Sequence, residues 1–126
     1  MTTPVAASAL ILFGHGSRDP LWHKPMQAVA ERMRELAADV TVQCAYLELT
    51  EPDLTTCAEQ LIDQGIQAIT IVPMFLGVGR HAREDLPRLM QALQARHPQV
   101  RLKLLDAVGE DARVIELLAR LALDAA

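Results

Sequence analysis

The sequence has few aromatic residues, few cysteines and no long uninterrupted hydrophobic run. Phe, Trp and Tyr make up 3% of the 126 residues, so we expect no base-stacking surface for single-stranded nucleic acid. The longest apolar stretch near the N-terminus, Val5 to Phe13, is far shorter than the ~20 residues that cross a bilayer, and it lacks the basic start of a signal peptide. We therefore expect a soluble, cytoplasmic protein that does not act on membranes.

The chain also has no excess of basic residues. The formal net charge is -4 and the sequence pI is about 5.5, so there is no general electrostatic reason to bind nucleic acid. Cys44 and Cys57 lack CxxC spacing and lie in apolar segments, which indicates small buried hydrophobes. The length fits one compact domain, residues 1–126, whose core must consist almost entirely of aliphatic side chains.

Four apolar segments have the length and composition of strands. They are Ser8 to Phe13, Thr41 to Leu49, Ala68 to Leu76, and Val100 to Leu105. Pro73 cannot donate a ladder hydrogen bond, so it marks a bulge or a strand end. The last segment alternates apolar residues with Arg101 and Lys103, which predicts a strand at a sheet edge.

Each predicted strand is followed by apolar residues at helical spacing, beginning near Met26, Leu54, Leu86 and Val114. We expect Thr50 to cap the second helix, Gly65 to end it, and Pro87 to lie in the first turn of the third. The order βαβαβαβα predicts an α/β fold, with a four-stranded parallel sheet and helices on both faces. Ligands of such sheets bind beyond the carboxyl ends of the strands, so the first three βα loops are the places to search.

Two histidines lie just after predicted strands. His15 stands in GHGSRD after the first strand, and His81 stands in GRHARED after the third. Imidazole suits both metal binding and proton transfer near neutral pH. Either histidine alone could be an ordinary turn or helix-start residue, but two at adjacent strand ends favour a functional site.

Glu48 is a third candidate, because it shares one strand face with Cys44 and Tyr46 and falls at the carboxyl end of the second strand. Two imidazoles and a carboxylate suit a borderline divalent metal and leave positions open for substrate or water. Glu51 is the competing carboxylate, but it fits better as charge in the first turn of a helix. We therefore favour Glu48.

The other two histidines have structural interpretations. His97 precedes Pro98 at a helix end and could meet the negative end of its helix. His23 lies in an early helical turn, close enough to the first loop for a supporting role.

Basic residues flank both histidine loops, and they are Arg18, Lys24, Arg80 and Arg83. They either attract a polyanionic small molecule or are ordinary solvated charge. Ser17 lies in no GxSxG elbow, so a serine hydrolase is not favoured. The GHGS turn lacks the Walker lysine and the GxGxxG pattern, which leaves a phosphate-binding loop as a minor alternative.

The segments LILFGHGSRDP, AYLELTEPDL and ITIVPMFLGVGRHAREDLP, in this order, resemble the small type of sirohydrochlorin chelatase, the short form of the class II tetrapyrrole chelatases. The resemblance extends from Leu10 to about Asp106. It implies a flavodoxin-like domain that inserts a divalent metal into a carboxylate-rich tetrapyrrole without ATP or an organic cofactor. The metal would be cobalt toward cobalamin or iron toward siroheme, and the same ligands suit nickel and zinc in vitro.

The resemblance also assigns roles to residues. His15 and His81 match the metal-binding histidines of the family, and Glu48 matches the acidic residue of its strand-end LE motif. We expect these three to ligate the metal and accept protons. The substrate is expected to contact Ser17, Arg18, Arg80 and Arg83.

Longer members of the family carry two such domains, so a single-domain chain is expected to form a homodimer around the tetrapyrrole. The alternatives are a non-catalytic metal or tetrapyrrole carrier that uses the same rim, and a flavodoxin-like phosphate or nucleotide binder that uses the Gly14 to Ser17 turn.

Overall fold

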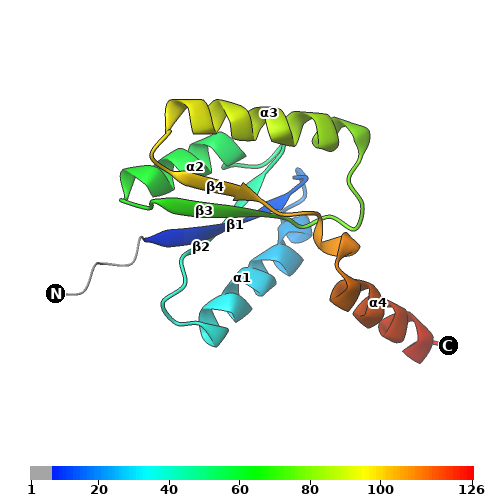
Figure 1. The fold of residues 1–126 in the computed structure, drawn as a ribbon. Helices are drawn as coiled ribbons and strands as arrows, with labels where there is room; N and C mark the ends of the chain where they lie inside the picture. The colour runs from blue at the N-terminus through cyan, green and yellow to red at the C-terminus, as the bar shows by residue number, and fades with distance from the viewer. Residues whose placement is uncertain (1–6) are drawn as a thin grey trace.

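The computed structural model describes residues 7–126, which form a four-stranded parallel sheet with helices on both faces (Figure 1). The strands are β1 (Ser8–Gly14), β2 (Val42–Tyr46), β3 (Ala68–Pro73) and β4 (Arg101–Leu104), in the spatial order β2-β1-β3-β4. The helices are α1 (Lys24–Leu36), α2 (Leu54–Asp63), α3 (Arg80–Arg96) and α4 (Ala112–Asp124), with short 3-10 helices η1 (Pro20–His23) and η2 (Val108–Glu110). The predicted α/β class and the edge position of β4 are confirmed. Residues 1–6 of the predicted domain lie outside the described residues.

The core has two parts because β1 lies in the middle of the sheet and buries both of its faces. Ile11 and Phe13 point toward α2 and α3, and Phe13 meets Phe75 edge-on with ring centroids 5.9 Å apart. Leu12 points the other way, where it packs with Met26 of α1. Because both faces of β1 are buried, successive residues are apolar, which explains the continuous apolar run in the sequence.

Both cysteines are free thiols with apolar neighbours, and the predicted burial is confirmed for Cys57 but only partial for Cys44. Cys57 is buried in the larger cluster, and burial raises the pKa of its thiol to about 11. Cys44 is half-buried against the smaller cluster, and burial likewise raises its pKa. Neither thiol is therefore poised to react as a thiolate near neutral pH.

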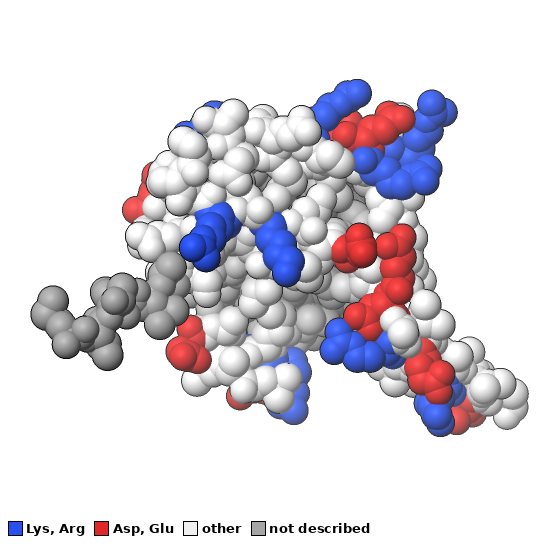
Figure 2. Space-filling view, in the orientation of Figure 1, with Lys and Arg blue, Asp and Glu red and all other residues white. Residues whose placement is uncertain are grey.

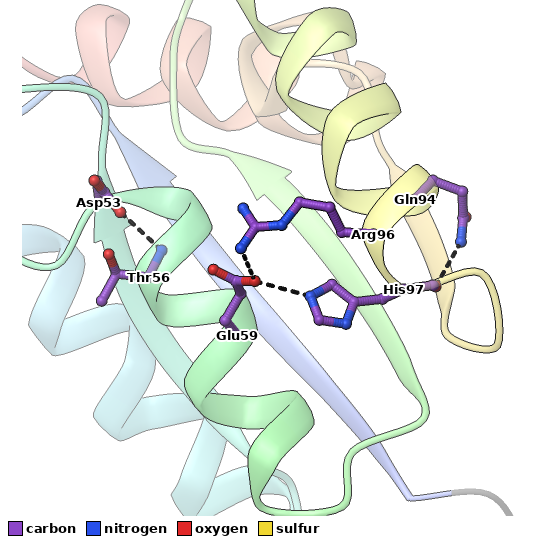
Figure 3. Close-up of polar contacts among 6 residues, drawn as sticks. All are labelled: Asp53, Thr56, Glu59, Gln94, Arg96 and His97. Atoms are coloured by element: carbon purple, nitrogen blue, oxygen red, sulfur yellow. Dashed lines mark hydrogen bonds and ion pairs between the residues drawn. The ribbon is translucent and has the colours of Figure 1, made fainter.

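Polar contacts join α2 to the end of α3 (Figure 3). Glu59 of α2 accepts from Arg96 Nη2 at 2.7 Å and meets His97 Nε2 at 2.9 Å. The hydrogen bond from His97, together with the charge of Arg96, lowers the pKa of the Glu59 carboxyl. At the other end of α2, Asp53 caps the helix by accepting from the Thr56 N–H at 2.8 Å.

Two strands end earlier than the sequence predicts. The second strand stops at Tyr46 rather than Leu49, because Leu49 adopts a left-handed φ of 66° and the Tyr46 N–H turns to the Pro52 carbonyl at 3.0 Å. The third stops at Pro73, short of Leu76, which confirms the strand end predicted as one of two possibilities at this proline.

Two predicted helix starts are also wrong. The cap of α2 is Asp53, since the Thr50 hydroxyl bonds elsewhere, and Gly65 follows the helix end with φ +96°, as expected of a residue past a C-cap. Helix α3 begins at Arg80, which places Pro87 inside the helix and not in its first turn. Pro87 and Arg83 are both exposed, so the Arg83 carbonyl that loses its intrahelical donor can be hydrated.

The last helix departs from the predicted layering. Helices α2 and α3 lie on one face of the sheet and α1 on the other, whereas α4 projects away from both layers (Figure 1). No residue of α4 is buried, although its N-terminus is capped by Asp111. No helix within residues 7–126 combines the length and the hydropathy that a membrane span requires.

Candidate functional site

His15 and Glu48 meet beyond the carboxyl ends of β1 and β2. His15 directly follows β1, and Glu48 lies two residues after the end of β2. His15 Nε2 is 3.1 Å from Glu48 Oε1, and each side chain is 56% exposed. The pair is therefore formed in the chain itself and remains open to a ligand.

Backbone contacts fix the two loops against each other. The Leu47 N–H donates to the Gly14 carbonyl at 2.9 Å, and the Glu48 N–H donates to the His15 carbonyl at 3.1 Å. Gly16 has φ +100°, and a Cβ at this position would lie 1.7 Å from the Glu48 carbonyl oxygen. Only glycine allows the two loops to approach this closely.

Thr50 holds the same loops together, in place of the helix cap that the sequence predicts for it. The Ser17 N–H donates to Thr50 Oγ1 at 3.1 Å, while the Thr50 hydroxyl donates to the Ser17 carbonyl at 2.8 Å. The Ser17 hydroxyl accepts from the Asp19 N–H at 3.0 Å. Ser17 thus shapes its own turn, and its N–H is already engaged, which argues against the phosphate-loop alternative.

His81 lies apart from the His15–Glu48 pair. It is exposed in the first turn of α3, which begins at Arg80 after the cap residue Gly79. Residues 7–126 contain no group of three or more His, Cys, Asp and Glu side chains placed to share a metal ion. The structure therefore brings two of the three predicted ligands together, and His81 is not joined to them.

The loop that leads to His81 is braced by a second glycine that the sequence analysis did not single out. The Gly109 N–H donates to the Phe75 carbonyl at 2.9 Å. A Cβ on Gly109 would lie 1.9 Å from the Leu76 carbonyl oxygen. The start of η2 therefore packs directly on the β3–α3 loop.

Glu51 shares a hollow with Glu48. This open hollow of ≈ 780 Å³ is lined by residues 47–53 together with Thr56 and Gln60. Glu51 precedes the first residue of α2 by three positions, so the interpretation of Glu51 as first-turn helix charge is wrong. Glu51 therefore adds a second carboxylate to the hollow that Glu48 lines, but Glu48 is the one that bonds to His15.

The charge at this edge of the molecule is mixed. Arg18, Arg80 and Arg83 are exposed, and Arg80 Nε pairs with Glu84 Oε1 at 3.3 Å. Arg83 lines a small cavity of ≈ 240 Å³ together with Asp106 and Glu110. Figure 2 shows basic side chains gathered at the end of α3 nearest η2, with acidic side chains among and below them. The arginines are available to anions, but carboxylates interrupt the predicted positive rim.

The other two histidines, His97 and His23, contact side chains outside the His15–Glu48 pair. The His97 ring bonds Glu59, so the predicted structural role of His97 is confirmed with α2 as its partner (Figure 3). The His23 ring lies between Trp22 and Tyr46, with ring centroids 5.7 and 5.1 Å away. Within residues 7–126, His23 Nδ1 is buried and has no hydrogen-bond partner.

Known proteins share this fold and sequence pattern. The family model described as CbiX matches residues 9–125. The sirohydrochlorin cobaltochelatase of Methanocaldococcus jannaschii is 35% identical over 89 residues, which are 71% of this chain and 62% of that one. The sirohydrochlorin ferrochelatase of Bacillus subtilis is 32% identical over 111 residues, which are 86% of this chain and 41% of that one.

A solved structure matches over nearly the full length. The crystal structure of a putative cobalamin biosynthesis CbiX protein from Marinobacter aquaeolei superposes with a TM-score of 0.79 and 30% identity, and the match covers 93% of each chain. By contrast, the chain spans less than two thirds of the length of the two curated relatives.

Proposed function

The chain belongs to the CbiX family, and on that premise we propose that it is a sirohydrochlorin chelatase that inserts a divalent metal into a carboxylate-rich tetrapyrrole without ATP. Cobalt is the favoured metal and iron the second, because the M. jannaschii cobaltochelatase is 35% identical to this chain and the B. subtilis ferrochelatase 32%. The observation that carries the proposal is the open His15–Glu48 pair at the carboxyl end of the sheet. The reaction would serve cobalamin or siroheme biosynthesis in the cytoplasm.

The pair suits this reaction because insertion releases two pyrrole protons as the hydrated metal ion exchanges water for pyrrole nitrogens. A neutral His15 that donates from Nε2 to Glu48 keeps a lone pair on Nδ1, which can ligate the incoming ion or take a proton. Glu48, 3.1 Å from His15 Nε2, would orient the ring and assist ligation or proton removal. Because few protein groups would ligate the metal, it could leave them for the pyrrole nitrogens.

Other residues complete the proposed site when substrate binds. His81, exposed at the start of α3, would supply a further ligand or base from the β3 side of the rim. Arg18, Arg80 and Arg83 would hold substrate carboxylates by charge-assisted hydrogen bonds, and Ser17 would contribute through the turn that it shapes. A homodimer would place two such rims around one tetrapyrrole.

The test is a metal-insertion assay with the purified protein. Sirohydrochlorin and Co²⁺ or Fe²⁺ are mixed with a substoichiometric amount of protein in the absence of oxygen, and the absorption spectrum is followed over time. Multiple turnovers above the uncatalysed rate support the chelatase. Stoichiometric binding without turnover would instead identify a metal or tetrapyrrole carrier, and no spectral change with any metal would overturn the proposal.

Variants then assign the residues. We expect His15→Ala and His81→Ala each to lower the insertion rate strongly, and Glu48→Gln to lower it roughly 10- to 100-fold, the usual range for a carboxylate that supports a ligating histidine. Glu51→Gln is the matched control, because Glu51 lines the same hollow but does not contact His15. Equal rates for the Glu48→Gln and Glu51→Gln proteins would remove Glu48 from the site.

A further inference from the structure

Leu49 lies next to Glu48 and adopts a conformation that leucine rarely takes. Its φ of 66° falls in the left-handed region, where residues other than glycine, asparagine and aspartate are strained. Within residues 7–126, Leu49 is the one non-glycine residue with a positive φ. The side chain is also 55% exposed, so burial offsets little of the strain. The stability of the fold therefore gives no reason for leucine at this position.

Contacts on both sides of Leu49 impose this conformation. On one side, the Glu48 N–H donates to the His15 carbonyl at 3.1 Å. On the other side, the Thr50 hydroxyl donates to the Ser17 carbonyl at 2.8 Å. Neither contact involves the side chain of Leu49, so glycine or asparagine would meet the same constraint with less strain. The reason for leucine lies in what its side chain contacts from outside the chain.

Large exposed apolar side chains are distributed unevenly over the two ends of the sheet. The loops at the amino ends of the strands, residues 37–41, 64–67 and 97–100, expose none of them. At the carboxyl end, the connection or segment after each strand exposes at least one, and these residues are Leu21, Trp22, Leu49, Leu76 and Leu105. Clustered exposed apolar residues mark binding surfaces. The edge that carries the His15–Glu48 pair is therefore suited to an apolar ligand surface as well.

The hollow beside the pair shows which part of a ligand can reach Leu49. Leu49 and Glu48 line the same open hollow of ≈ 780 Å³, and Glu51 and Asp53 line it too. Because like charges repel, these carboxylates keep the carboxylates of a polyanionic substrate out of the hollow. An uncharged part of the substrate is what approaches Leu49.

We propose that Leu49 is a specificity-determining residue that packs against an uncharged face of the tetrapyrrole ring, while His15 and Glu48 act at the ring nitrogens. That the ligand is a tetrapyrrole rests on the proposed function. A conjugated macrocycle has broad apolar faces, and its carboxylates lie at the periphery, where arginines such as Arg18 would pair with them. The strained turn holds the leucine side chain at the rim before substrate binds, which lowers the cost of ordering it on binding.

The first test measures the binding of sirohydrochlorin without metal, so that it does not depend on turnover. Quenching of the fluorescence of Trp22, the only tryptophan of the chain, reports the dissociation constant. Leu49→Asn and Leu49→Gly keep the left-handed turn but remove the apolar contact, so each should bind roughly 5- to 10-fold more weakly. Leu49→Met should bind like wild type, and so should Leu36→Asn, the matched control, because Leu36 is 69% exposed on α1. Wild-type affinity in both Leu49→Asn and Leu49→Gly would overturn the proposal.

The second test separates a substrate contact from a structural role. Asparagine enters the left-handed region more readily than leucine, so Leu49→Asn should unfold at or above the wild-type Tm while it binds more weakly. Salt screens the ion pairs of Arg18 but not an apolar contact, so the loss of affinity in Leu49→Asn should stay constant as salt is raised, whereas that in Arg18→Gln shrinks. A lower Tm for Leu49→Asn, or a loss of affinity that disappears at high salt, would overturn the proposal.

Steady-state kinetics distinguish failure of this contact from failure of the proposed function. In an active protein, Leu49→Asn should raise KM for sirohydrochlorin by roughly 5- to 10-fold and leave kcat within about twofold, because His15 and Glu48 are unchanged. Metal insertion with a wild-type KM in Leu49→Asn contradicts the role of Leu49 alone. Leu49-dependent binding of sirohydrochlorin without insertion of Co²⁺ or Fe²⁺ contradicts the proposed function alone.

Discussion

Gly16 shows how a single residue sets the geometry of the candidate site. We expect Gly16→Ala to destabilise the protein by at least about 2 kcal/mol, because φ +100° strains any other residue and the new Cβ would overlap the Glu48 carbonyl. The same change should lower metal insertion, since relief of the overlap separates the loops that carry His15 and Glu48. Urea unfolding at fixed pH measures the stability.

Gly77→Ala is the control for this prediction. A Cβ at Gly77 meets no atom within 4 Å, so its unfolding free energy should stay within about 0.5 kcal/mol of wild type. Should the Gly16→Ala and Gly77→Ala proteins unfold at the same urea concentration, the close approach at Gly16 is not what orders the site.

Sequence reasoning finds some site residues and misses others for a physical reason. His15 and Glu48 were predictable because each follows a strand that apolar periodicity reveals, and parallel strands end at one edge. The local pattern predicts Thr50 as a helix cap. It cannot show that the partner of Thr50 is Ser17, which lies 33 positions away. Gly109 was missed likewise, since its role depends on a contact with Leu76. Long-range contacts carry no local sequence signature.

At the scale of elements, periodicity predicts the four strands and four α-helices of residues 7–126 but not the 3-10 helices η1 and η2, and the ends of the elements depend on competing contacts. Pro87 was expected in a first turn, yet Gly79 allows α3 to begin earlier and an exposed helix surface tolerates the proline. The strand leading to Glu48 was expected to continue to Leu49, yet the left-handed turn at Leu49 ends it. The φ angle of a single residue can end a strand, and the spacing of hydrophobic residues in the sequence does not reveal that angle.

The tie between α2 and α3 predicts a pH-dependent contribution to stability. The folded state lowers the pKa of Glu59 through the hydrogen bond from His97 and the charge of Arg96. Because the pKa of Glu59 is lower in the folded state, folding favours the ionised carboxylate. Its contribution to the free energy of unfolding is complete above the ordinary carboxyl pKa and disappears as the pH falls through the lowered pKa. Glu59→Gln should therefore reduce the Tm at pH 7, and the difference from wild type should shrink toward pH 3.

Thermal unfolding followed by circular dichroism across this pH range checks the prediction. Glu35→Gln serves as its control, because among residues 7–126 Glu35 pairs only with Arg32 on the same helix and both side chains are more than 60% exposed. A Tm difference for Glu59→Gln that stays constant down to pH 3 would show that the carboxylate does not tie the two helices.

At the scale of the whole molecule, topology explains both where the site lies and why one helix is left over. The connection after β1 leads to β2 on one side and the connection after β3 leads to β4 on the other, so the strand order reverses between β1 and β3. The loops after β1 and β3, which lead to His15 and His81, flank this point, as the ligand rule for open sheets predicts, and Glu48 after the edge strand β2 pairs with His15. The order of strands also puts α2 and α3 on one face and α1 alone on the other. The sequence predicted four helices on two faces, but their distribution follows from a strand order that one sequence does not reveal.

This uneven cover predicts that the stability of the protein depends on its concentration. If the proposed homodimer covers the open sheet face, folding and association are one equilibrium, and each tenfold rise in concentration stabilises the folded dimer by up to ~1.4 kcal/mol. For two chains of 126 residues, the Tm should then rise by roughly 5 to 10 °C between 1 and 100 µM protein. If the exposed apolar face of α4 forms the dimer interface, the Leu121→Glu protein should unfold at one temperature throughout, because Leu121 lies on that face and the new charge would prevent association. A wild-type Tm that is constant over this hundredfold range would mean that a single chain is the stable unit and that its uncovered sheet face tolerates water.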